Sequence, residues 1–177
     1  DLNANQTVVA AYLYWSGSGT GDFDITLNGE LRTASRTFSI QENGLDYFAA
    51  FEDVTSQIQA LTTNQLTFSN FDIDVSAHCA NATNYGGWAM VVVYEDAMLP
   101  VNDIRVNDGF VSVSALNPMV SITLDEPIIY STTTATIGFL AWEGDSSLAN
   151  GENLSINGEI IQNPPLNPGD NLFNGTN

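Results

Sequence analysis

The chain has 177 residues, of which 44% are hydrophobic, so it can bury one substantial core. It contains 21 acidic residues, three arginines and no lysine, which gives a formal net charge of −18. Nucleic acids and anionic lipid headgroups are bound largely through Lys and Arg, so this balance argues against both as partners. The sequence also has no apolar run long enough to insert in a membrane.

Short alternating or apolar runs predict strands in the first part of the chain. These runs are residues 7–15, 23–27, 30–40 and 46–54. Asn28-Gly29 and Asn43-Gly44 supply residue pairs that favour tight hairpin turns. Residues 53–61 are the one segment with helical spacing, and Asp53 or Thr55 is the expected N-cap.

The strand pattern continues through the second part of the chain. Residues 64–76 alternate, and residues 87–96 form the most hydrophobic run, which predicts a central strand covered on both faces. Further strands are expected at residues 103–106, 109–115, 119–124, 134–142, 154–156 and 159–162. About a dozen short strands with one short helix predict an all-β fold, a jelly-roll-like β-sandwich.

One sequence motif occurs twice, over residues 11–30 and 138–159. Each copy has an apolar run ending in Trp, a Gly-containing acidic loop and an Asn-Gly hairpin. Duplication explains the repeat, and so does convergence on common structural parts. The chain is expected to form one β-sandwich domain over residues 1–162, followed by an extended Pro- and Asn-rich tail or linker over 163–177.

The sequence offers no clear catalytic group. His78 is the only histidine, and it stands beside the only cysteine, Cys79; adjacent residues on an extended chain point in opposite directions. We therefore expect no enzyme, with His78 in an exposed loop and Cys79 as a small buried thiol. Four glycosylation-type sequences, which the sequence alone does not assign as modified, occur at Asn5, Asn81, Asn153 and Asn174.

Acidic loops make calcium the expected cofactor, because calcium accepts carboxylates, Asn side chains and loop carbonyls without strict geometry. The candidate ligands are Asp22, Asp24, Asn102, Asp103, Asp108, Glu143, Asp145 and Glu152. The alternative for each loop is an ordinary solvated turn.

Aromatic residues offer a second kind of site, a stacking platform for sugar rings. The candidates are Trp15, Trp142, Tyr12 and Tyr14. On a strand, Tyr12 and Tyr14 share one face and Trp15 lies on the other, so one set is expected in the core and the other partly exposed.

Five short motifs resemble a module of large secreted bacterial surface proteins. They are "AYLYW" (11–15), "LNG" (27–29), "DVT" (53–55), "GWAMVVVYED" (87–96) and "DGF" (108–110). The resemblance implies an extracellular, cell-surface location in an adhesin-like polypeptide with neighbouring repeated β-domains. It implies no catalytic residues.

We therefore expect a non-enzymatic extracellular structural or adhesive β-module, either a unit of a surface adhesin or a subunit of an extracellular fibre. Its partners would be other copies of itself or neighbouring β-domains. Residues 7–15, apolar on both faces, would pair within their own sheet or complete that of a neighbour. The alternative is a calcium-assisted carbohydrate-binding module with a polysaccharide partner.

Overall fold

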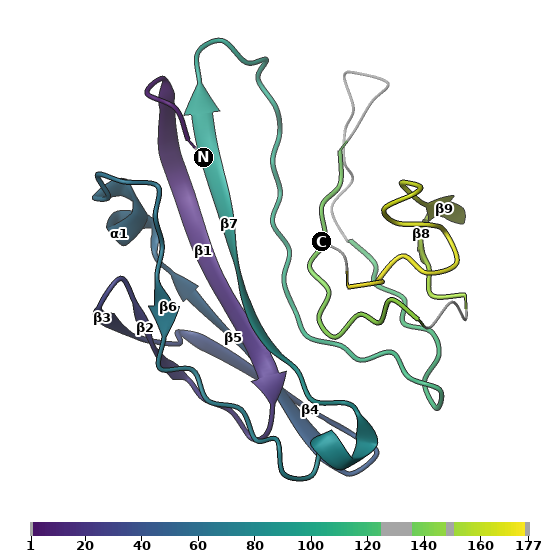
Figure 1. Cartoon of the computed structure of the whole chain (residues 1–177). Helices are drawn as coiled ribbons and strands as arrows, with labels where there is room; N and C mark the ends of the chain where they lie inside the picture. The colour runs from purple at the N-terminus through teal and green to yellow at the C-terminus, as the bar shows by residue number, and fades with distance from the viewer. Residues whose placement is uncertain (1, 125–135, 148–150, 176–177) are drawn as a thin grey trace. The chain divides into compact units, whose positions relative to one another are not determined.

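The computed structural model describes residues 2–124, 136–147 and 151–175 (Figure 1). The chain divides into two compact units, Asp1–Tyr130 and Ser131–Asn177. Antiparallel sheets make up both units, which confirms the all-β fold expected from the sequence. The division at residue 130 differs from the expected boundary at residue 162.

A four-stranded sheet with the order β4-β5-β1-β7 dominates the first unit. Its strands are β1 (Gln6–Ser18), β4 (Arg36–Glu42), β5 (Leu45–Asp53) and β7 (Gly86–Asp96). Figure 1 shows β1 and β7 side by side along their length, and β1 pairs with β5 on its other side. Strand β1 is therefore paired within its own chain with β7 from Gln6 to Gly17 and with β5 from Tyr12 to Ser18.

Strand β7 lies at the edge of this sheet, so the expectation of a central strand at residues 87–96 is wrong. The run is apolar for a different reason. Met90 and Val92 pack against the core on one face, Val91 and Val93 lie on the opposite face, and all four are half-buried. The two faces of a strand are covered by what packs above and below the sheet, not by the strands beside it. An edge strand can therefore carry apolar side chains on both faces.

A smaller sheet with the order β3-β2-β6 packs against one face of the large sheet. Its strands are β2 (Asp24–Leu27), β3 (Glu30–Thr33) and β6 (Phe68–Ser69). The core between the sheets includes Leu13, Trp15, Ile25, Leu27 and Phe48, each at most 1% exposed. Residues that alternate along β1 and β2 thus meet in one apolar layer, as a β-sandwich requires.

The predicted turns and helix form near their expected positions. Asn28 and Gly29 have φ values of 50° and 80° and join β2 to β3, and Asn43 and Gly44 join β4 to β5 in the same way. Helix α1 (Thr55–Gln59) is shorter than expected. The Asp53 carboxylate accepts bonds from the Thr55 backbone N–H (3.0 Å) and hydroxyl (2.6 Å), and these bonds lower the pKa of Asp53.

The second unit contains a hairpin of β8 (Leu154–Ile156) and β9 (Glu159–Ile161) with Asn157-Gly158 at its turn. Residues 163–175 return to this unit instead of extending away from it. The Leu172 N–H donates to the Glu152 carbonyl (2.9 Å), and the Leu172 side chain is only 3% exposed. The hairpin half of the repeated motif is therefore present in both units.

Several expected strands do not form within the described residues. The structure has nine strands there instead of about a dozen, and residues 103–106, 109–115, 119–124 and 136–142 are outside them; residues 134–135 lie outside the described part of the chain. The 109–115 segment keeps its alternation, with Val111 and Val113 exposed. Alternation alone does not make a strand, because the backbone also needs a hydrogen-bonding partner. No helix in the described segments has the length and apolar character required to cross a bilayer.

Candidate ligand-binding site

The alternation of β1 places two tyrosines on the outer face of the large sheet. Trp15 is fully buried on the core face, while Tyr12 and Tyr14 are half-buried on the other, as predicted. Both tyrosine rings pack against Phe51 of β5, with ring centroids 5.7 Å and 5.2 Å apart. The register of the sheet brings them together, because Tyr14 lies opposite Phe51.

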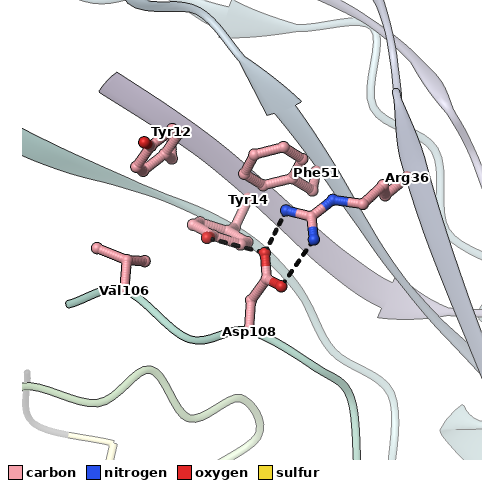
Figure 2. A pocket seen from close by; sticks show the side chains of 6 residues that line it. All are labelled: Tyr12, Tyr14, Arg36, Phe51, Val106 and Asp108. Atoms are coloured by element: carbon pink, nitrogen blue, oxygen red, sulfur yellow. Dashed lines mark hydrogen bonds and ion pairs between the residues drawn. The ribbon is translucent and has the colours of Figure 1, made fainter. Parts of the chain in front are cut away.

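A charged pair closes this aromatic group. Arg36 of β4 also lies opposite Phe51, and its guanidinium carbon is 3.9 Å from the centroid of the Phe51 ring. The two terminal guanidinium nitrogens donate to the two carboxylate oxygens of Asp108 (2.8 Å and 2.5 Å), and the Tyr14 hydroxyl donates to the same carboxylate (3.2 Å). Figure 2 shows the carboxylate pointing toward both donors. We refer to Arg36, Asp108 and Tyr14 as the clasp.

The rings and the clasp surround a cavity of about 280 Å³ (Figure 2). Its lining is Tyr12, Tyr14, Arg36, Phe51, Val106 and Asp108, and we call it the aromatic pocket. Beyond the pocket, the hydroxyls of Ser112 and Ser114 donate to the Glu42 carboxylate at the far end of β4 (3.0 Å and 2.8 Å). Side-chain bonds therefore hold the segment after β7 across the outer face of the sheet.

Electrostatics keep the Tyr14 hydroxyl protonated. Burial, the negative charge of Asp108 and the hydrogen bond to Asp108 raise the pKa of Tyr14 to about 12, and the charge of Arg36 opposes this shift. The hydroxyl therefore remains a hydrogen-bond donor to a higher pH than an ordinary tyrosine would. Because Arg36 and Asp108 neutralise each other, the pocket carries one cation and one anion side by side within a strongly acidic protein.

The expected calcium ligands of the first unit are engaged in local bonds. The Asp22 carboxylate accepts from the Asp72 backbone N–H (2.8 Å), and the Asp24 carboxylate accepts from the Thr33 hydroxyl (2.5 Å). Among the others, Asn102 donates to the Pro100 carbonyl (3.1 Å), Asp103 forms an ion pair with Arg105 (3.4 Å), and Asp108 belongs to the clasp. These contacts orient the loops. Of the expected calcium ligands, Asp108 lines the aromatic pocket.

Glu143, Asp145 and Glu152 influence one another in the second unit. Burial, followed by the charges of Asp145 and Glu152, raises the pKa of Glu143. Burial and the charge of Asp145 also raise the pKa of Glu152. Across the residues that the structure describes, no group of three or more His, Cys, Asp or Glu side chains is arranged to hold a metal ion. Calcium binding remains a prediction.

Two of the four expected stacking residues line the aromatic pocket, namely Tyr12 and Tyr14. The expectation for Trp15 is wrong, because this side chain is fully buried and its indole N–H donates to the Asp22 carbonyl (2.8 Å). Trp142 is half-buried in the second unit. Sequence reasoning missed Phe51 and Arg36, whose positions in the pocket depend on the pairing of β4 and β5 with β1.

The positions expected for His78 and Cys79 are reversed. His78 is 3% exposed, its Nε2 lies 2.8 Å from the Asp46 carbonyl oxygen, and its ring packs edge-on against Tyr47. Cys79 is exposed at the start of the 3₁₀ turn Cys79–Asn81. The cause is local geometry, since a turn at this point directs neighbouring side chains to opposite environments.

Comparison with models of known protein families, with curated proteins and with solved structures finds no match to this chain. The resemblance to modules of bacterial surface proteins therefore stays an expectation.

Proposed function

We propose that the chain is a non-enzymatic, extracellular adhesive β-module that binds a saccharide in the aromatic pocket. The observation that carries this proposal is the grouping of three aromatic rings and a guanidinium–carboxylate pair around one half-open cavity. This combination suits sugars, which present C–H faces to aromatic rings and hydroxyls to charged groups. The proposal joins the adhesive function expected from the sequence to its carbohydrate-binding alternative.

The polar groups of the pocket complement hydroxyl groups. A sugar hydroxyl donates and accepts hydrogen bonds, so it matches the Asp108 carboxylate as acceptor and the Arg36 guanidinium as donor. Arg36 uses two of its five N–H groups on Asp108. The half-buried Tyr12 ring supplies apolar surface beside them, whereas the Phe51 ring is only 8% exposed and supports Tyr12 and Arg36 from below. A cavity of about 280 Å³ is small, so we assign it one sugar ring and not a long chain.

Charge favours a neutral sugar over an acidic one. The carboxylate of Asp108 already occupies the bidentate position on Arg36 that a ligand carboxylate would need. The net charge of −18 also repels polyanions over long distances. Arg36 and Tyr14 already hold the Asp108 carboxylate in place, so no calcium ion is needed to orient it. Saccharide binding in this pocket is therefore proposed to be independent of calcium, unlike binding by a calcium-assisted module.

A glycan array followed by calorimetric titration of the bound glycan tests the proposal. Tyr12→Ala should weaken binding about 2- to 13-fold, because an aromatic contact contributes about 0.5–1.5 kcal/mol beyond its buried area. Phe139→Ala is the matched control, because Phe139 is an aromatic residue that is 48% exposed and belongs neither to the pocket nor to β7. Binding in the presence of a chelator should be unchanged. An array without any neutral glycan bound, or a Tyr12→Ala variant with unchanged affinity, contradicts the proposal.

A further inference from the structure

Strand β7 presents an unusual sheet edge. Within residues 2–124, β1 is the only strand that pairs with it, so the backbone groups along its other side have no strand partner. Edge strands of soluble proteins commonly carry charges or proline to prevent pairing with other chains. Residues 86–94 contain neither, and the acidic residues Glu95 and Asp96 occur only at the end of the strand.

We propose that two copies of this chain pair antiparallel along β7, around a two-fold axis that passes through Val91. Val91 is the central residue of Gly86–Asp96, so this register overlaps the two strands over their full length. It places Trp88 of each copy opposite Tyr94 of the other. These two side chains are 39% and 38% exposed, and aromatic cross-strand pairs stabilise sheets.

The charges of β7 favour a second copy as the partner. In the antiparallel register, the acidic end of each strand, Glu95 and Asp96, lies beside the uncharged Gly86-Gly87 end of the other. This register keeps the acidic residues of the two strands apart. Like charges directly opposite each other would destabilise the strand pair. Dimerisation is still opposed by electrostatic repulsion between two chains that each carry a net charge of −18. Salt screens this repulsion.

Pairing through β7 gives a closed assembly. The two large sheets become one continuous sheet, and the same surface of each copy is used, so the contact does not propagate. We therefore expect a dimer and not a fibre from this contact. In each copy β1 pairs with β7 from Gln6 to Gly17 and with β5 from Tyr12 to Ser18, and the dimer contact uses the other edge of β7, so it does not depend on donation of β1. The inference stands apart from saccharide binding, because no pocket residue belongs to β7.

Sedimentation velocity over a range of protein concentrations, at low and high NaCl, tests the dimer. The unaltered chain should dimerise, and more strongly at high salt. Val91→Lys should weaken dimerisation at least about 10-fold, because it places two ammonium groups opposite each other. Val101→Lys adds the same charge at a fully exposed position outside β7 and should leave the dimer intact. Circular dichroism of each variant confirms that the sheet is retained.

A disulfide test measures the register without relying on a disruptive substitution. In a Cys79→Ser background, Val91→Cys should form an intermolecular disulfide under mild oxidation, because directly opposite residues lie within bonding reach. Val101→Cys in the same background should not. A chain that is monomeric at every concentration and salt level overturns the proposal. So does a dimer that Val91→Lys leaves unchanged, or a dimer that Val91→Cys fails to cross-link, since either result places the contact elsewhere.

Discussion

The clasp should couple two distant parts of the chain by a measurable energy. Arg36 and Asp108 meet through two charge-assisted bonds, and Asp108 follows β7 while Arg36 begins β4. A hydrogen bond to a charged group contributes about 1.5–3 kcal/mol when well protected. The Arg36 side chain is 49% exposed, however, and solvent-exposed ion pairs contribute about 0.2–1 kcal/mol. Because the geometry is bidentate, we expect a coupling energy of about 1 kcal/mol.

A double-mutant cycle measures this coupling. The free energy of unfolding is obtained from urea titrations of the unaltered chain, Arg36→Ala, Asp108→Ala and the double variant. Asp108→Ala alone should cost about 1–2 kcal/mol, since it also removes the bond from Tyr14. Raising NaCl to 1 M should reduce the coupling, because the pair is partly exposed. Additive effects of the two substitutions, within about 0.3 kcal/mol, would refute the clasp as an energetic link.

Three further predictions concern titration and metal binding. Spectrophotometric titration of tyrosinate should show that Asp108→Asn lowers the pKa of Tyr14 from about 12 toward 10, because the negative charge is lost while burial remains; an unchanged titration contradicts the contact. The folded state raises the pKa values of Glu143 and Glu152, so it binds more protons than the unfolded state, and the second unit should become more stable as pH falls from 7 through these pKa values. The prediction is contradicted if the unfolding midpoint of the second unit decreases as the pH is lowered, while that of a variant with both Glu143→Gln and Glu152→Gln does not. Calcium at about 100 times its Kd should add about 2.7 kcal/mol to the free energy of unfolding, and equal melting midpoints with calcium and with chelator would exclude that cofactor.

Local sequence rules predicted the parts of the fold that depend on neighbouring residues. The hairpins at Asn28-Gly29 and Asn43-Gly44 form because these residues adopt the positive φ values that tight turns need. The alternation of Tyr12 and Tyr14 with Trp15 follows directly from strand geometry. The sequence alone therefore predicted two of the three aromatic residues that line the pocket, Tyr12 and Tyr14.

Long-range pairing decided the features that the sequence could not predict. The run 87–96 has the composition of a central strand, but its place at the edge follows from which strand pairs with β1. Arg36 and Phe51 reach the pocket only because β4, β5 and β1 align in one register. Apolar alternation at residues 109–115 predicts a strand, but the segment forms none and is held by side-chain bonds from Ser112 and Ser114.

The central position of β1 also has a consequence for the order in which the chain folds. Gln6 pairs with Asp96 at one end of the β1–β7 ladder, so β1 remains without this partner until the chain through β7 has been synthesised. The β4–β5 hairpin needs only a short loop and can form early. Such dominance of contacts distant in sequence slows folding and leaves an apolar strand unsatisfied in the meantime. A chaperone that binds exposed apolar strands would therefore be expected to bind residues 6–18 before β7 pairs with them.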